Sequence, residues 1–187
     1  MVSAVVKPRP FTYVEYALLP SDGRVWELVD GDFHVNPAPV PFHQTVSRRL
    51  QLRLMLLLEE PGIAAVFNAP TDVILSETTT VQPDLAVISM QHRRQVSDRG
   101  IEGSPDIIVE ILSSNPAYDQ VLKRGTYERH GVPEYWLVDP RAGTVEMLRL
   151  DAGLYRTLAL YRRDDTLVSP SFDGRISIPL GPVFAPF

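Results

Sequence analysis

The chain has 187 residues, of which 44% are hydrophobic and 22% charged, with a formal net charge of −5 and no cysteine. This composition is ordinary for a globular protein, and the length is enough to bury a full core in one domain over residues 1–187. No apolar run approaches the roughly 18 residues of a membrane span, and the N-terminus lacks a charged-then-apolar leader, so we expect a cytoplasmic protein without membrane contact. The absence of cysteine excludes disulfides and thiolate metal sites, which leaves oxygen and imidazole as metal ligands.

The net charge also bears on nucleic-acid binding. Domains that bind nucleic acid tightly and without sequence preference usually carry a basic surface. Here arginines cluster only locally, at Arg48, Arg49 and Arg53, at Arg93-Arg94 and at Arg162-Arg163. The charge therefore disfavours a general nucleic-acid binder. It does not exclude a nuclease, whose acidic residues would be neutralised by divalent metal ions.

The N-terminal half contains signals for helices, strands and a hairpin. A capping-box pattern at Thr12–Glu15 predicts a short helix that ends at Pro20. Asp30-Gly31 is a strong signal for a tight hairpin between two short strands. Apolar residues at helical spacing predict a long helix that stops before Pro61-Gly62. The hairpin strands, the long helix, two further strands and a polar loop are predicted at residues 24–29, 32–36, 41–60, 64–68, 72–75 and 76–80.

The segment from Pro105 to Pro140 predicts a strand, a helix and a second strand. Ile107–Leu112 is a short, nearly continuous apolar run, which is typical of a strand buried on both faces. Asn115-Pro116 is a suitable helix start and Gly131 a suitable helix end, and the second strand follows at Glu134–Asp139. Two strands and a helix in this length predict a right-handed crossover between parallel strands.

The remaining segments are predicted from turn signals. Residues 91–104 are polar and contain two glycines, so we expect a mobile loop near the site. Asp151-Ala152-Gly153 lies between two strands, at 144–150 and 154–161, and predicts a second hairpin. The tail, 169–187, is interrupted by proline and glycine, and we expect it to pack along an edge.

Two acidic residues stand in or beside apolar strand segments. Glu110 interrupts the run Ile107–Leu112, and Asp84 precedes the apolar run Leu85–Ile88. A buried carboxylate is costly unless it is paired, hydrogen-bonded or bound to a cation. A metal ion shared by the two carboxylates is the leading explanation. Lys123, two turns into the predicted helix, could reach back over the strand that carries Glu110.

Several of these residues together resemble a known family. The matching segments are Glu27–Gly31, His43-Gln44, Gln82–Asp84, Pro105–Ser113, the row Asp119-x-x-x-Lys123-x-x-x-Tyr127 and Gly131–Pro140. They look like the Uma family of restriction-endonuclease-like proteins, part of the PD-(D/E)XK nuclease superfamily, and the resemblance spans about residues 12–184. It implies an α/β fold with a restriction-endonuclease-like core: a mixed central sheet flanked by helices, with N-terminal and C-terminal antiparallel hairpins.

The resemblance also implies a catalytic site. Asp84 would be the first acid of the motif and Glu110 the second, and together with the Ile111 carbonyl they would hold Mg²⁺ or Mn²⁺. The superfamily usually has a lysine two residues after the second acid. That position is Leu112 here, and Lys123 on the next helix resembles a migrated replacement.

Two more residues and the activity follow from the same resemblance. Glu27 would match an additional N-terminal acid of the family, and His43 would lie nearby in the site. The implied activity is metal-dependent hydrolysis of DNA phosphodiester bonds. Because cutting both strands of a duplex would take one site per strand, we also expect a homodimer.

Each site residue also has a purely structural explanation. Asp84 could start a strand and cap a turn, and Glu110 could pair with an arginine in the core. Lys123 could pair only with a neighbour on its own helix, Glu27 could be a solvated hairpin residue, and His43 could be a surface histidine. Tyr135 and Trp136 are expected to pack in the core rather than to stack on bases.

Two other functions therefore stay open. The first is a catalytically inactive relative that binds nucleic acid or a protein partner and keeps its acids for structural reasons. The second is another enzyme with paired carboxylates, such as a glycoside hydrolase. The second is disfavoured because it gives Lys123 no role and because the chain shows no aromatic-rich sugar cleft.

Overall fold

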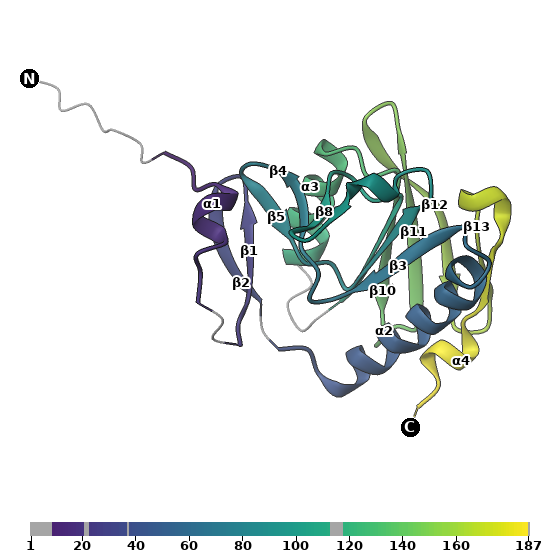
Figure 1. The fold of residues 1–187 in the computed structure, drawn as a ribbon. Coiled ribbons are helices and arrows are strands. Elements are labelled where there is room, and N and C mark those ends of the chain that lie inside the picture. The colour runs from purple at the N-terminus through teal and green to yellow at the C-terminus, as the bar shows by residue number, and fades with distance from the viewer. Residues whose placement is uncertain (1–8, 21–22, 37, 113–117, 187) are drawn as a thin grey trace, which may run out of the picture.

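The computed structural model describes residues 9–20, 23–36, 38–112 and 118–186, and the strands within them form three sheets (Figure 1). The first sheet has the order β2 (Asp32–Asn36), β1 (Val25–Val29), β5 (Thr79–Val81), β4 (Val73–Ser76), β8 (Gly100–Glu102), β7 (Val96–Ser97). The second has the order β12 (Leu154–Arg162), β11 (Thr144–Asp151), β10 (Glu134–Asp139), β9 (Ile107–Ile111), β6 (Leu85–Ser89), β3 (Ala64–Asn68). The third pairs β13 (Thr166–Ser169) with β14 (Ile176–Pro179).

The helical segments are short apart from one. The long helix α2 continues directly into a turn of wider π-type helix, η1, so the helix predicted over 41–60 is confirmed. The segments are α1 (Tyr13–Tyr16), α2 (Pro41–Leu54), η1 (Met55–Glu59), η2 (Arg93–Gln95), η3 (Tyr118–Lys123), α3 (Arg124–Arg129), η4 (Ser171–Gly174) and α4 (Gly181–Phe184). Among the described residues, no helix combines the length and the apolar character that crossing a membrane requires.

The second sheet is the mixed central sheet that was predicted. Strands β9 and β10 are parallel, with Ile107 opposite Glu134, and the other pairs in this sheet are antiparallel. The chain passes between β9 and β10 through η3 and α3, so the predicted strand–helix–strand order with parallel strands is confirmed. The predicted helix start at Asn115-Pro116 lies outside the described residues.

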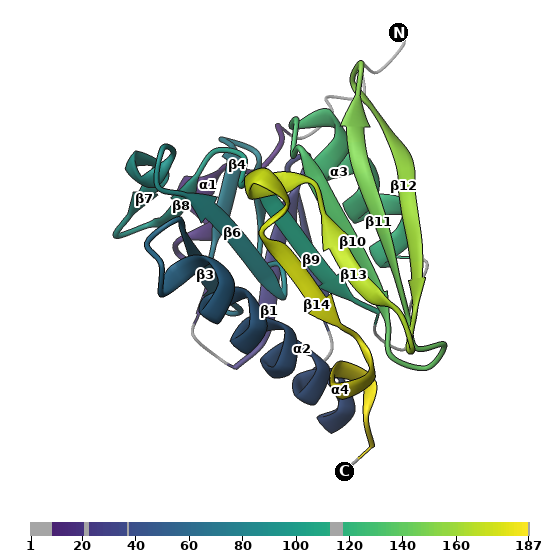
Figure 2. The same ribbon diagram turned by 90° about the vertical axis from the view of Figure 1, so that its right-hand side faces the viewer.

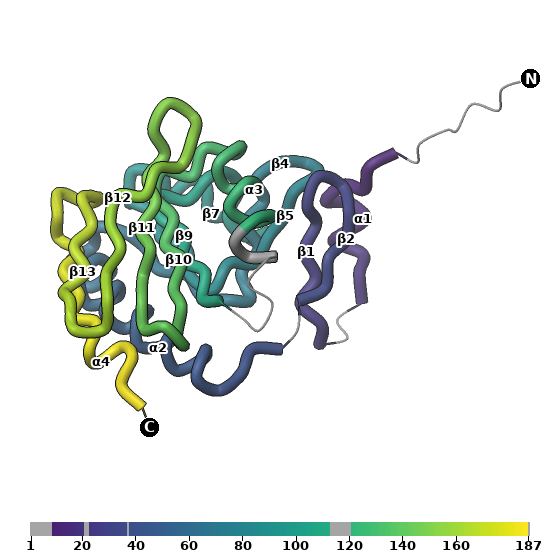
Figure 3. Tube along the Cα trace, turned by 180° about the vertical axis from the view of Figure 1, so that it is seen from behind, coloured from purple at the N-terminus to yellow at the C-terminus, as the bar shows by residue number. Residues whose placement is uncertain are grey.

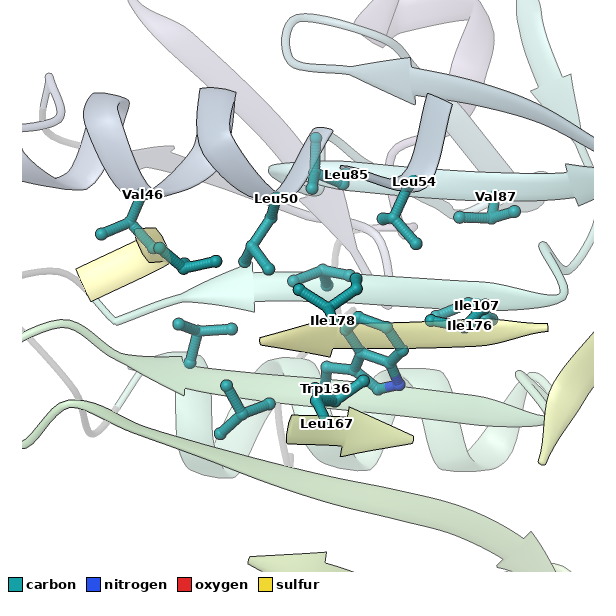
Figure 4. Packing of buried hydrophobic residues seen from close by; sticks show 14 of the residues in the cluster. Val46, Leu50, Leu54, Leu85, Val87, Ile107, Trp136, Leu167, Ile176 and Ile178 are labelled. Carbon is teal, nitrogen blue, oxygen red and sulfur yellow. The ribbon is translucent and has the colours of Figure 1, made fainter. Parts of the chain in front are cut away.

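One face of this sheet is covered by α2 and by the C-terminal strands (Figure 2). Figure 4 shows Leu50 and Leu54 of α2 near Leu85 of the sheet, with Ile107 near Ile176 and Trp136 near Ile178 from the tail. Full burial of one such side chain stabilises the fold by about 1.5–3 kcal/mol. The tail therefore packs over a face of the sheet rather than along an edge, which corrects the prediction. The reason is that Leu167, Ile176 and Ile178 alternate inward on β13 and β14.

The opposite face of the sheet packs against α3 and the first sheet (Figure 3). Its core includes Ile108 and Tyr135 from the sheet and Tyr127 from α3, all fully buried. The predicted core positions of Tyr135 and Trp136 are thus both confirmed, on opposite faces of β10 as the period-two alternation requires. Glu110 faces the same side as Ile108, so its carboxylate points into the layer between the central sheet, α3 and β1.

The N-terminal hairpin forms as predicted. Asp30 and Gly31 both have positive φ, 52° and 85°, which is the conformation of a two-residue hairpin turn. Gly31 is also required sterically, because a Cβ there would stand 2.2 Å from Pro10 Cβ.

Two predicted loops contain strands instead. The predicted loop 76–80 includes β5, which pairs with β1 and β4. The segment 91–104 holds η2 and the β7–β8 hairpin, in which β8 also pairs with β4. These strands are only two or three residues long, too short for an apolar alternation to reveal them.

Candidate functional site

Asp84 and Glu110 meet on neighbouring antiparallel strands. Leu85 on β6 is opposite Val109 on β9, so Asp84, one residue before β6, stands opposite Glu110 on the same face of the sheet. The backbone N–H of Ile111 donates a hydrogen bond of 2.8 Å to Asp84 Oδ2. The two carboxylates predicted from the sequence are therefore brought together, and the end of β9 is tied to Asp84.

Lys123 joins this pair to a third carboxylate. It is the last residue of η3, and its Nζ lies 2.9 Å from Glu110 Oε1 and 3.0 Å from Glu27 Oε1 on β1. The side chains of Lys123 and Glu110 are each 4% exposed and that of Glu27 is 0% exposed. The amine thus reaches back over the strand of Glu110 as expected. It does not pair merely within its own helix, and Glu27 is not a solvated hairpin residue.

The two glutamates are held by further hydrogen bonds. Glu27 Oε1 accepts from the backbone N–H of Gln82 at 2.8 Å, and Glu27 Oε2 accepts from Asn36 Nδ2 at 2.7 Å. Tyr127, one helical turn after Lys123, donates from its hydroxyl to Glu110 Oε1 at 2.5 Å. These donors fix both carboxylates from several sides, as buried charges require.

His43 lies at the edge of the same cluster. It is in the first turn of α2, is 6% exposed, and its Nε2 is 3.2 Å from Asp84 Oδ2. The side chain of Asp84 is 19% exposed, more than those of Glu27, Glu110 and Lys123. The cluster is therefore most accessible to solvent at Asp84.

Burial and the neighbouring charges shift the pKa values of two members of the cluster, Glu110 and Lys123. Burial raises the pKa of Glu110, the carboxylates of Asp84 and Glu27 add to the rise, Lys123 and Tyr127 oppose it, and the value is about 8. Burial lowers the pKa of Lys123, but the carboxylates of Glu110, Glu27 and Asp84 outweigh it and hold the pKa well above its ordinary value. Burial is the main cause of the shift in Glu110, whereas in Lys123 the negative charge of the carboxylates outweighs burial, and both shifts favour a bound proton.

The arrangement fits a hard cation such as Mg²⁺. Such an ion is held by one or two carboxylates, with carbonyl oxygens, waters and substrate oxygens completing its shell. Within the described residues, Asp84 Oδ1 and Glu110 Oε2 make no hydrogen bond, so each acid keeps one oxygen for a ligand. Leu112 N–H donates to Val138 O on β10. Successive residues of a strand direct their backbone groups to opposite neighbouring strands, so Ile111, one residue earlier, directs its N–H and C=O toward β6 and Asp84. The described residues contain no cluster of three or more His, Asp or Glu side chains arranged as a metal site.

Three residues of the cluster were not predicted as site residues. Tyr127 bonds to Glu110, whereas Gln82 and Asn36 bond to Glu27. Tyr127 could have been found, because it lies four residues after Lys123 and so shares its helix face. Gln82 lies in a segment that matches the family, but its backbone N–H contact to Glu27 has no side-chain signal, and Asn36, across the β1–β2 hairpin, has no signal at all.

A mixed sheet with acids on adjacent strands and a lysine on the crossover helix defines a restriction-endonuclease-like fold. Residues 13–181 match the Uma2 family model, described as "Putative restriction endonuclease", and the chain belongs to this family. A similar solved structure is that of a "putative nuclease belonging to DUF820" from Anabaena variabilis. It is 21% identical, the TM-score is 0.78, and the match covers 94% of this chain and 98% of that one. A search of curated proteins found no match.

Proposed function

We propose that this protein is a divalent-metal-dependent endonuclease that hydrolyses DNA phosphodiester bonds. The observation that carries the proposal is the placement of Asp84 and Glu110 side by side with the Lys123 ammonium 2.9 Å from Glu110. The descriptions "Putative restriction endonuclease" for the family and "putative nuclease" for the Anabaena protein support the same chemistry.

The roles of the residues follow from their chemistry. Asp84, Glu110 and the Ile111 carbonyl would hold Mg²⁺ or Mn²⁺, which lowers the pKa of water and offsets charge on the phosphate. Lys123 would hold the attacking water or a phosphate oxygen as negative charge develops. In the reaction, the water loses a proton to solvent as its oxygen adds to phosphorus, the bond to the leaving oxygen breaks, and the leaving oxygen takes up a proton from solvent.

Glu27 and His43 would act through these groups. Glu27 Oε1 lies 3.0 Å from Lys123 Nζ, so it would set the direction of the ammonium. His43 lies 3.2 Å from Asp84 Oδ2, so it would orient that carboxylate. A symmetric dimer would supply one such site for each strand of a duplex.

The test is metal-dependent nicking of a supercoiled plasmid by the wild type, by Asp84→Asn and by Glu110→Gln. We expect nicking with Mg²⁺ or Mn²⁺, none with EDTA, and a loss of at least about a hundredfold in both variants, because removing a group that only orients a metal ligand already costs about 10–100-fold. Glu146→Gln on β11 is the matched control, because Glu146 bonds to Thr157 outside the cluster, and it should nick normally. Equal nicking by Glu110→Gln and Glu146→Gln would rule out the proposed site.

A second candidate is an inactive relative that binds nucleic acid or a protein partner. The observation that favours it is the nearly complete burial of the Lys123–Glu27 pair, which could serve only to neutralise charge in the interior. The two candidates differ in their metal dependence. An inactive relative would leave plasmid intact with or without Mg²⁺, whereas the proposed nuclease would cut it only with the ion.

A further inference from the structure

A pocket of about 460 Å³ lies beside the candidate active site. Its wall includes Phe67 on β3, Asp72 before β4, the side chain of Gln82 and residues 96–101 of the β7–β8 hairpin. Gln82 links the pocket to the candidate active site, because its backbone N–H donates to Glu27 Oε1 at 2.8 Å. Gln82 is also two residues from Asp84, and two residues span at most about 7 Å. A group in the pocket would therefore lie next to a phosphate bound at Asp84.

Two residues that line the pocket, Asp72 and Gln82, have side chains held by hydrogen bonds. Asp72 Oδ1 accepts from Tyr16 OH at 2.7 Å and from Gln82 Nε2 at 2.8 Å. Burial and the neighbouring Asp72 raise the pKa of Tyr16, so its hydroxyl stays a donor and holds Asp72 in place. In the part of the chain that the structure describes, Asp72 Oδ2 and Gln82 Oε1 accept no hydrogen bond. Each can therefore accept a proton from a ligand.

The remaining wall includes one aromatic ring, and the hairpin that forms part of it is held in place. Phe67 is a partly buried ring on the wall, and Arg99 adds a guanidinium that stacks 4.2 Å from the ring centroid of Tyr13. The hairpin is fixed on the pocket because Ile101 N–H donates to Asp72 O at 2.8 Å. A Cβ at Gly100 would stand 2.3 Å from the same oxygen, so only glycine allows this close approach.

We propose that this pocket receives adenine or cytosine, the bases that carry an amine where guanine and thymine carry a carbonyl oxygen, next to the phosphate that is cut. The proposal rests on the proposed function for the position of that phosphate. Carboxylate and amide oxygens accept hydrogen bonds from the amino groups of cytosine and adenine, whereas thymine presents an acceptor at the same place. A phenylalanine ring provides a face on which any base stacks.

The test is fluorescence anisotropy with labelled single strands dA10, dC10 and dT10, with Ca²⁺ in place of Mg²⁺ to measure binding without cleavage. The quantity compared is the ratio of the Kd for dT10 to the Kd for dA10 or dC10. We expect Asp72→Asn to lower both ratios by about tenfold relative to the wild type. The introduced asparagine would keep the Oδ1 acceptor for Tyr16 and Gln82. The substitution then changes only the other oxygen, Oδ2, into an amide nitrogen that donates a hydrogen bond instead of accepting one.

Two further variants separate base reading from charge and from stacking. Asp98→Asn removes the same charge from the same pocket and should leave both ratios unchanged. Phe67→Leu should weaken the binding of all three strands by at least about fivefold and also leave the ratios unchanged.

The base subsite and the nuclease activity can fail independently, and the measurements distinguish the two failures. Ratios within about twofold of wild type in Asp72→Asn, an equal shift in Asp98→Asn, or no binding of any strand would overturn the inference. Plasmid nicking together with unmoved ratios would overturn the inference and leave the nuclease standing. Shifted ratios in a protein that nicks nothing would support the base subsite and overturn the nuclease.

Discussion

Replacing Lys123 with methionine should strongly destabilise the protein. Methionine keeps the apolar stem of the side chain but removes the ammonium that lies 3.0 Å from Glu27 Oε1 and 2.9 Å from Glu110 Oε1. Both carboxylates are buried, and removing one partner of a buried pair typically costs about 3–5 kcal/mol. We therefore expect the free energy of unfolding to fall by about that amount at pH 9. At pH 6 the loss should be smaller, because a proton on Glu110 can replace the lost charge.

The assay is urea unfolding at 25 °C, followed by the fluorescence of the tryptophans, of which Trp136 is fully buried. Arg149→Met is the matched control: Arg149 lies 3.8 Å from the buried Glu134, but its own side chain is 46% exposed. An exposed cation contributes little, so the control should lose less than about 1 kcal/mol. Adding Glu27→Gln to Lys123→Met should restore part of the stability. A Lys123→Met variant within about 0.5 kcal/mol of the wild type at pH 9 would refute the reasoning.

Three further predictions concern single residues around the cluster. Tyr127→Phe removes the 2.5 Å hydrogen bond to Glu110, so unfolding free energy should fall by about 1–3 kcal/mol in urea titration, and unchanged stability would show that the bond contributes nothing. Glu134→Ala removes the acceptor of Trp136 Nε1, Ser169 and Ser171 and should cost about 2–4 kcal/mol, while the nicking rate per folded molecule stays at the wild-type value. The pKa of Glu110, about 8 in the folded protein, exceeds its unfolded value near 4.3, so the metal-free folded state binds more protons between these values. Its stability should therefore fall as the pH rises from about 5 to 8, and this slope should disappear in Glu110→Gln.

Much of the fold could be predicted because its signals are local. The Asp30-Gly31 turn, the helical spacing of α2 and the apolar run around Glu110 each specify their element without long-range information. The strands β5, β7 and β8 could not be predicted, because elements of two or three residues carry no readable period. The tail was misplaced because its apolar residues show that it packs, but do not show on which surface.

The candidate site was only partly predictable for a similar reason. Glu110 stands out as an acid inside an apolar strand, whereas the site role of Lys123 is implied by the resemblance to the family, because its place on the next helix shows only that it could reach that strand. The contact between Lys123 and Glu27, however, joins residues far apart in the sequence. It depends on how β1 packs against the face of the central sheet, which no local pattern of the sequence encodes.

The most direct test of the proposed site is a Mn²⁺-soaked crystal examined for anomalous scattering. The proposal predicts a single strong peak held by Asp84, Glu110 and the Ile111 carbonyl, with Lys123 still paired to Glu27. A peak elsewhere on the chain, or none at this position while Lys123 keeps both glutamates, would contradict it.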